Sequence, residues 1–265
     1  MTYISNKDYH LSLALSRIED QYGDIVSIDN KKKSLIKFGQ NESVGTTSTT
    51  IMQLATGVHE ILVASNLITS VVSSSASDTG SFYYEGHTIS GSDASFSGVT
   101  NGTNLTGQTI KTLDTALFRI TRARMLTSPA VGTIYFYEGG AVSGGVPTDL
   151  TKVHTIIKAG DVQTQKASTT TSSSDYWFID SFTASVLKKT ASFAQFRIES
   201  KPITGTLWYP QTQWVSVSNS SGTVQINLPE ILIIPKNYDV RLVAIADGAG
   251  THLSGGMSGW LGAIV

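Results

Sequence analysis

The chain has 265 residues, a formal net charge of −1 at pH 7 and no cysteine. A nearly neutral chain has no overall field that would attract nucleic acid or an anionic membrane surface, so we expect neither as a partner. The lack of cysteine excludes disulfides, thiolate metal sites and thiol nucleophiles. No stretch approaches the roughly 20 apolar residues that a membrane helix needs, and the apolar run near the N-terminus is too short for a signal peptide. We therefore expect assembly in a cytoplasm.

One helix is predicted, over residues 9–22. Leu11, Leu15, Ile18 and Tyr22 recur there at helical spacing, and Gly23 follows as a stop. Leu13 interrupts this stripe, so a strand over residues 9–15 stays open.

Residues 1–55 lack the dense strand pattern of the rest of the chain, so we interpret them as an N-terminal arm and residues 56–265 as the body. The arm carries a run of three lysines, Lys31, Lys32 and Lys33. Such a run is more often a solvated turn than a contact to phosphate or to an acidic partner. On this division, deletion of residues 1–45 is expected to leave a folded body.

Strand patterns follow from Gly57 onward, every eight to fifteen residues, with scarcely any helical periodicity. This rhythm predicts an all-β fold, a β-sandwich or jelly roll. Residues 74–80, 91–106 and 139–150 are expected to be loops, the last a flexible glycine-rich excursion. The predicted strands are 60–64, 68–73, 82–90, 107–113, 153–157, 162–170, 176–186, 192–199, 213–217, 224–228, 238–246 and 257–264.

Residues 116–139 are expected to form a central pair of strands joined at residues 127–129. The first of the two carries Arg119, Arg122 and Arg124. Arginine is costly to bury unpaired, so these side chains face solvent, pair with acids inside the sandwich or contact another subunit. We favour a subunit contact for at least one of them. A second hairpin is predicted from residues 224–235 and 238–247, turned at Pro235-Lys236-Asn237.

No motif of catalysis or metal binding stands out. The five histidines have no ligand-like spacing, and the aspartates mostly lie beside Gly, Ser or Thr, where short carboxylates cap turns. No nucleophile elbow, dinucleotide fingerprint or P-loop is present. We therefore assign no catalytic, cofactor-binding or metal residue, while a polysaccharide-cleaving carboxylate pair on a jelly roll stays open as an alternative. Of the aromatic groups at 83–84, 135–137, 176–178 and 208–209, about half are expected in the core and the rest at an interface.

Several short fragments spread along the chain are informative through their order and spacing. They are Lys37-Phe38-Gly39-Gln40-Asn41, Val44-Gly45-Thr46, Thr50-Ile51, Ser73-Ser74-Ser75-Ala76-Ser77-Asp78-Thr79, Phe118-Arg119-Ile120-Thr121-Arg122, Gly132-Thr133-Ile134, Ala159-Gly160, Gln163-Thr164, Ile234-Pro235-Lys236 and Asp239-Val240-Arg241. In this order and spacing the chain resembles a family of tailed-phage virion structural proteins, several of which are capsid decoration or cement proteins. Where that family commonly has a Trp and paired glycines, Met52-Gln53-Leu54 follows here.

The resemblance implies a β-sandwich on the surface of a phage head, without catalysis or cofactor. The implied partners are the major capsid protein and further copies of the chain, with a homotrimer as the natural oligomer. A rigid body with a reaching arm suits such a role, because modest contacts repeated by symmetry add up to strong binding. The expected capsid contacts are Lys31, Lys32, Lys33, Lys37 and Phe38. A head fibre, a tail adaptor or a module that binds a host receptor or glycan is the alternative virion position.

Overall fold

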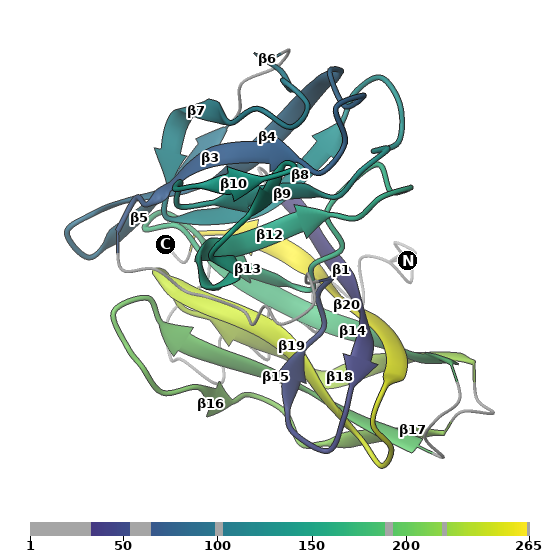
Figure 1. The fold of residues 1–265 in the computed structure, drawn as a ribbon. Coiled ribbons are helices and arrows are strands. Elements are labelled where there is room, and N and C mark those ends of the chain that lie inside the picture. Colours follow the sequence, from purple (N-terminus) through teal and green to yellow (C-terminus); the bar gives the residue numbers. More distant parts are fainter. Residues whose placement is uncertain (1–32, 54–64, 99–102, 189–192, 219–221, 264–265) are drawn as a thin grey trace, which may run out of the picture.

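The computed structural model describes residues 33–53, 65–98, 103–188, 193–218 and 222–263, which form two β-sandwiches, one above the other in Figure 1. Within these residues the only helical element is a short 3-10 turn, η1 (Leu150–Lys152). The predicted all-β, sandwich-like fold is confirmed. The predicted helix over 9–22, the strand over 60–64, Lys31 and Lys32 lie outside the described residues.

The lower sandwich packs two antiparallel sheets face to face. The first, called the β20 sheet, has the order β1 (Lys33–Val44), β20 (Thr251–Gly262), β14 (Tyr176–Lys188), β18 (Thr223–Ile234). The second, called the β19 sheet, has the order β13 (Ser168–Thr170), β19 (Tyr238–Ala246), β15 (Phe193–Pro202), β16 (Tyr209–Pro210), with β17 (Val215–Ser218) on β15 and β2 (Thr49–Thr50) on β19.

Alternation along the strands builds the lower core. On β15 the apolar Ala194, Phe196 and Ile198 are buried in the core, while the residues between them are polar or charged. Trp177 and Phe182 reach the same core from β14 on the opposite sheet. Each sheet therefore gives one face to the core, as expected for a sandwich.

The upper sandwich is built from the middle of the chain. Its β9 sheet has the order β12 (Val153–Ile157), β9 (Ile134–Tyr137), β3 (Ile68–Ser73), β7 (Lys111–Leu117). Its β4 sheet has the order β5 (Asp93–Gly98), β4 (Ser81–Ser90), β6 (Thr103–Asn104), with β8 (Arg119–Met125) also paired to β4. Phe82 and Phe136 meet edge to face at 6.0 Å between the two sheets, in a core separate from the lower one. A small hairpin, β10 (Val142–Ser143) with β11 (Val146–Pro147), lies against the other face of the β9 sheet.

A buried polar junction connects the two sandwiches. Arg119 on β8 donates to both carboxylate oxygens of Asp239 on β19, at 3.0 and 2.9 Å. Lys201 Nζ lies 3.1 Å from the same carboxylate, and Thr170 donates to it at 2.7 Å. Nearby, Lys37 Nζ on β1 donates to the backbone oxygen of Thr121 on β8 at 3.1 Å. The sandwiches are therefore joined through charges that are shielded from water.

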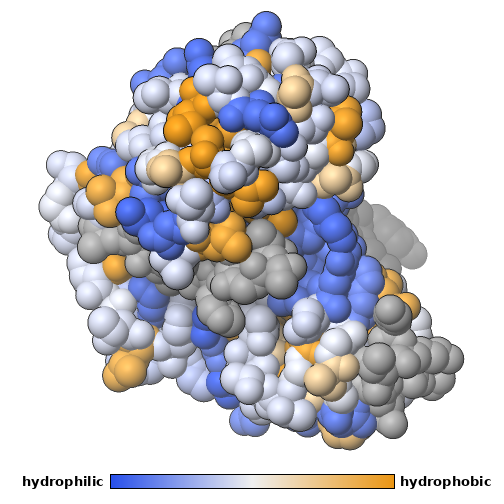
Figure 2. Space-filling view, in the orientation of Figure 1, coloured by the Kyte–Doolittle hydropathy of each residue, from blue (hydrophilic) through white to orange (hydrophobic). Residues whose placement is uncertain are grey.

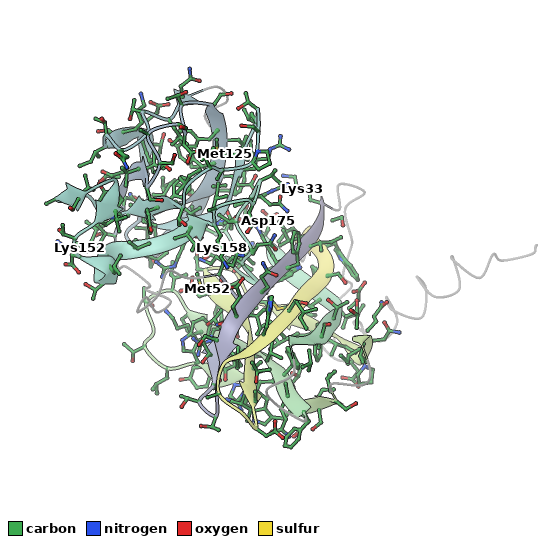
Figure 3. All side chains as sticks on the ribbon, turned by 45° about the vertical axis from the view of Figure 1, so that its right-hand side comes forward. Lys33, Met52, Met125, Lys152, Lys158 and Asp175 are labelled. Atoms are coloured by element: carbon green, nitrogen blue, oxygen red, sulfur yellow. The ribbon has the colours of Figure 1, made fainter. Side chains whose placement is uncertain are left out.

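The predicted N-terminal arm is wrong for residues 33–53. β1 pairs with β20 from Lys33 opposite Leu261 to Val44 opposite Thr251, and Val44 is part of the lower core. Figure 3 shows β1 along the outside of the lower sandwich, with Lys33 at the end nearest the upper one. The sequence does not indicate this strand because its apolar and polar residues do not alternate regularly. Its place in the sheet depends on pairing with β20, which is distant in the chain.

Both predicted hairpins are also wrong. β8 pairs with β4 and β9 pairs with β3 and β12, so the central pair is split between two sheets. Likewise β18 pairs with β14, whereas β19 pairs with β15 and β13. The turn at Pro235-Lys236-Asn237, with Asn237 at a φ of 59°, therefore leads from one sheet of the lower sandwich to the other. Sequence neighbours that cross between sheets are common in sandwiches with Greek-key connections.

Two predicted loops contain strands. Residues 91–106 include β5, which pairs with β4 across its whole length. The glycine-rich residues 139–150 form the β10–β11 hairpin, where Gly144 and Gly145 have φ of 56° and 74°. A Cβ at Gly145 would overlap the backbone oxygen of Ser73, so this turn is packed on the β9 sheet. By contrast, β3, β12 and β19 have the predicted bounds.

Deletion of residues 1–45 should prevent folding of the lower sandwich, contrary to the expectation from the sequence, because it removes β1 and exposes β20. Deletion of residues 1–32 removes no described strand and should retain cooperative unfolding. Thermal unfolding followed by circular dichroism distinguishes the two. A cooperative transition of the 46–265 chain at the full-length temperature would contradict this.

Replacement of Asp239 by Asn should cost about 3–5 kcal/mol, because Arg119 and Lys201 would stay buried without their counter-charge. Arg122→Ala, at an exposed site of the same strand as Arg119, should cost less than about 1 kcal/mol. Urea denaturation at pH 7 measures both free energies of unfolding. Equal losses of unfolding free energy for the two variants would show that the buried junction contributes no more to stability than an exposed side chain does.

Candidate functional site

The predicted contact residues of β1 lie on opposite faces of the strand. Phe38 is 46% exposed on the outer face of the β20 sheet, and Lys33 is exposed at the end of β1. Lys37, in contrast, is buried at the junction of the two sandwiches. Phe38 and Lys33 are therefore accessible to a partner, and Lys37 is not.

The three arginines of β8 divide in the same way. Arg119 is buried and paired with Asp239, which is the second of the three predicted situations. Arg122 is exposed and donates to Gln163 at 2.9 Å, while the guanidinium of Arg124 lies 5.1 Å from the centre of the Tyr83 ring. A subunit contact is excluded for Arg119 and stays a prediction for the other two.

The polar face of the β19 sheet is a network of matched charges. Glu199 on β15 accepts hydrogen bonds from Arg197 on its own strand and from Arg241, directly opposite on β19. The Trp208 ring covers the Arg241 guanidinium, with 3.9 Å from Cζ to the ring centre. Burial would raise the pKa of Asp239, but Arg119 and Lys201 outweigh it and hold that pKa below its usual value. These acids and bases are therefore engaged in structural pairs.

Two further titratable groups of the junction are shifted by burial. Desolvation lowers the pKa of Lys37 to about 8, although Glu85 nearby opposes the shift. Burial lowers the pKa of His87 to about 4, so its imidazole is neutral at pH 7. His87 packs edge-on against Phe96, at 5.5 Å between ring centres.

A hollow of about 260 Å³ lies beside Phe38 on the outer face of the β20 sheet. We call it the Phe38 hollow, and its lining has no ionisable side chain; it includes Phe38, Gln40, Thr183, Ser185, Leu187, Thr223 and Ser254. Phe38, Gly256 and Thr183 stand in one row across three strands. A Cβ at Gly256 would lie 2.7 Å from the backbone oxygen of Lys37 and 3.0 Å from the Cβ of Phe38, so a side chain has no room between the strands at this position.

A larger hollow, of about 520 Å³, opens at the β18 edge of the lower sandwich. We call it the β18 groove, and it is lined by Phe182, Gln211, Thr212, Gln213, Val215, Ile226, Leu228, Pro229, Glu230, Ile231, Leu232 and Ile233. Asn227 is opposite Ser181 and Leu232 is opposite Ile179, so residues 228–231 bulge opposite a single residue of β14. The bulge interrupts the strand ladder beside the groove, while Leu228 and Leu232 on either side of it still pack against the lower core.

About half of the aromatic groups lie in the core, as predicted, while an interface for the others stays a prediction. Residues 135–137 are buried, as are Trp177 and Phe178. Tyr209 is 53% exposed, and Leu207 beside it is 67% exposed. In Figure 2 the hydrophobic residues of this face gather mainly over the upper sandwich, and the lower sandwich shows only small groups of them among polar residues.

Within the described residues no group of three or more His, Asp or Glu side chains is arranged to hold a metal ion. In the same part of the chain no helix is long and apolar enough to cross a membrane. Both hollows offer apolar surface with hydroxyl and amide groups, and the β18 groove adds the carboxylate of Glu230.

Sequence reasoning found Phe38 but missed the other residues of the Phe38 hollow. Thr183 and Ser185 alternate with the core residues Phe182 and Ala184, which is a signal that they face outward. Their position next to Phe38 depends on the pairing of β20 with both β1 and β14. Through that pairing Thr183 lies near Phe38, although the two residues are more than 140 positions apart in the chain, so no local sequence pattern indicates their proximity.

Lys37→Met should change the pH dependence of stability. Because the folded pKa is about 8 and the unfolded value 10.5, the unfolded chain holds an extra proton between these values. The contribution of Lys37 to stability therefore rises over that range, on the order of 3 kcal/mol, and the variant lacks the rise. Urea denaturation from pH 7 to 10.5 measures it, with the exposed Lys33→Met as control. Parallel curves for Lys37→Met and the unmodified chain would refute the shift.

Comparison with known proteins finds no matching family model and no matching curated protein. Solved structures that align include the VP2 subviral particle of infectious bursal disease virus, at 11% identity over 90% of this chain and 72% of the other, with a TM-score of 0.17. A structure of the Gt strain of the same virus aligns at 10% identity over 90% and 82% of the two chains, with a TM-score of 0.12. Scores this low carry no argument about fold or function.

Proposed function

We propose that the chain is a non-enzymatic structural protein of a tailed-phage virion, a decoration or cement protein that bridges and stabilises major capsid protein subunits. The resemblance of its sequence fragments to that family suggests the class. The observation that carries the proposal is the outer face of the β20 sheet, where Ile36 is 65% and Phe38 46% exposed beside the Phe38 hollow, which has no ionisable lining.

An uncharged hollow with exposed apolar side chains beside it suits a protein partner. Burying one such side chain contributes about 1.5–3 kcal/mol, and no charged group in the hollow would have to be desolvated. Each contact of this kind is weak. A lattice that repeats it, through several copies or a homotrimer of the chain, multiplies its effect by avidity.

The stiffness of the body supports the same role. The ion pair of Asp239 with Arg119 joins the two sandwiches, and that of Glu199 with Arg241 joins two strands of the β19 sheet. A force applied to the lower sandwich is therefore transmitted to the upper one. A cement protein requires such a rigid link, because it resists relative movement of the subunits that it bridges. On this proposal the protein resides on the head surface after assembly in the host cytoplasm.

A glycan or host receptor as ligand is the second candidate. The observation in its favour is that the Phe38 hollow combines an aromatic ring with the hydroxyl groups of Thr183, Ser185, Thr223 and Ser254. Aromatic faces and hydroxyl groups together are typical of sugar sites. A head fibre or tail adaptor would use the same surface at another place on the virion.

Phe38→Asp should reduce binding to phage heads that lack the protein by about thirtyfold, the effect of a central interface residue worth about 2 kcal/mol. Val131→Asp, a change at a 62% exposed site of the upper sandwich, should bind normally. Co-sedimentation with purified heads measures the bound fraction, and thermal unfolding verifies that both variants fold. Normal binding of Phe38→Asp would remove the hollow as the contact.

Imaging of labelled particles tests the position itself. Copies distributed over the head lattice are expected for a cement protein. A few copies at one vertex or on the tail would instead establish a fibre or adaptor, and release of wild-type protein from heads by an oligosaccharide would favour the glycan candidate.

A further inference from the structure

We propose that the outer face of β8 binds an extended acidic segment of a different protein through the guanidinium groups of Arg122 and Arg124. Both arginines are exposed on the upper sandwich, whereas the Phe38 hollow lies on the lower one. The inference does not rest on the proposed function, because it concerns the chemistry of this strand and its test needs no phage head.

The two arginines form no ion pair with the described residues. The structure describes five arginines, and three of them pair with carboxylates: Arg119, Arg197 and Arg241. Arg122 instead donates to the amide oxygen of Gln163 at 2.9 Å, and the guanidinium of Arg124 lies over the Tyr83 ring. In a chain with only 15% charged residues, these two cations at alternate outward positions of one strand form a locally positive site.

One carboxylate lies beside this site and belongs to its charge balance. Glu85 is opposite Arg122 on β4, and its carboxylate accepts a hydrogen bond from the Tyr83 hydroxyl. With the charge of Glu85 counted, Arg122 and Arg124 still leave an excess of one positive charge. An incoming segment with two carboxylates therefore meets a net attraction.

Neutral neighbours restrain both arginine side chains. Gln163 is opposite Arg124 on one side of β8 and also bonds to Arg122, while Tyr83 is opposite Arg124 on the other side. A restrained arginine loses less conformational entropy when its planar group binds a carboxylate through two parallel hydrogen bonds. The site is thus prepared for carboxylates without being neutralised by its own neighbours.

The spacing of the arginines selects an extended ligand. Arg122 and Arg124 are two positions apart on a strand, so their Cα atoms are separated by about 6.6 Å. Two acidic side chains at alternate positions of an extended segment have the same separation and point in the same direction. Acidic side chains at adjacent positions would point to opposite sides, so only one of them could reach an arginine.

Apolar side chains continue this face beyond Arg124. Leu126 is 41% and Val162 50% exposed, and the backbone N–H of Met125, labelled in Figure 3, donates to Val162 at 2.7 Å. Arginine beside apolar surface is typical of protein interfaces. Because Leu126 follows Arg124 by two positions, the expected ligand has two acidic residues and one apolar residue at alternate positions.

Nucleic acid and a second copy of the chain fit this face less well. A phosphate backbone makes no use of Leu126 and Val162, and a net charge of −1 provides no field that attracts a polyanion. The sequence contains no two acidic residues that are two positions apart, so another copy of the chain does not supply the required pattern. The partner is therefore a different protein.

Peptide titration of the full chain tests the proposal. The probe is the synthetic peptide Gly-Ser-Glu-Thr-Glu-Thr-Leu-Ser-Gly. One control peptide has Gln in place of both Glu, and a second, Gly-Ser-Glu-Glu-Thr-Thr-Leu-Ser-Gly, places the same acids at adjacent positions. From the chemical shifts of isotope-labelled protein we expect saturable binding of the probe, with a dissociation constant below about 1 mM in about 50 mM salt. Both control peptides should bind at least about fivefold more weakly.

Substitutions locate the site. Arg122→Gln and Arg124→Gln should each weaken binding of the probe about fivefold, and the double variant should weaken it about twentyfold. Lys152→Gln, which removes an exposed cation elsewhere on the upper sandwich, should bind the probe normally. Thermal unfolding verifies that all variants fold.

Four outcomes overturn the proposal. They are the lack of saturable binding, a control peptide that binds as tightly as the probe, equal losses for Lys152→Gln and the arginine variants, and an oligothymidylate that binds at least as tightly as the probe. The last outcome would identify a phosphate backbone as the ligand. None of them affects the proposed function, which is tested separately by the binding of Phe38→Asp to phage heads.

Discussion

The carboxylate of Asp239 is the group on which the arrangement of the whole molecule depends. It lies on β19 in the lower sandwich and receives Arg119 from β8 in the upper one, together with Lys201 and Thr170. Each charge would be costly to bury alone, and only the complete set satisfies all of them. The two sandwiches therefore have one relative position in which these groups are paired. Apolar packing provides the stability of each sandwich, while this junction determines how they are joined.

The distribution of charge follows from that constraint. The chain has only 15% charged residues, and several of them are used in the junction and on the polar face of the β19 sheet. The lining of the Phe38 hollow has hydroxyl, amide and apolar side chains and no ionisable group, although Asp180 is exposed on the same face of the sheet, where it accepts from Ser258. A contact confined to the hollow depends on shape and apolar surface, and salt should affect it little.

The two hollows have different positions and different chemistry. The Phe38 hollow lies on the outer face of the β20 sheet, and its lining combines Phe38 and Leu187 with hydroxyl and amide groups and has no ionisable group. The β18 groove lies where residues 228–231 bulge opposite a single residue of β14, and its lining is more apolar but includes Glu230. On the proposed function, the Phe38 hollow is the surface that meets a partner.

The sequence by itself determined the all-β class and the bounds of β3, β12 and β19, because alternation and β-branched residues are local signals that neighbours in the chain carry. It also singled out Phe38, which the structure leaves exposed, and the arginines of β8. Only the tertiary structure decided that Lys37 and Arg119 are buried, that β1 belongs to a sheet and that β8 and β9 lie in different sheets. Those outcomes depend on groups that are distant in the chain. Asp239 is 120 residues from Arg119, and the residues of β20 are more than 200 positions from their partners on β1. A strand with a mixed pattern is stable in several pairings, and the partner that satisfies its buried charges selects among them.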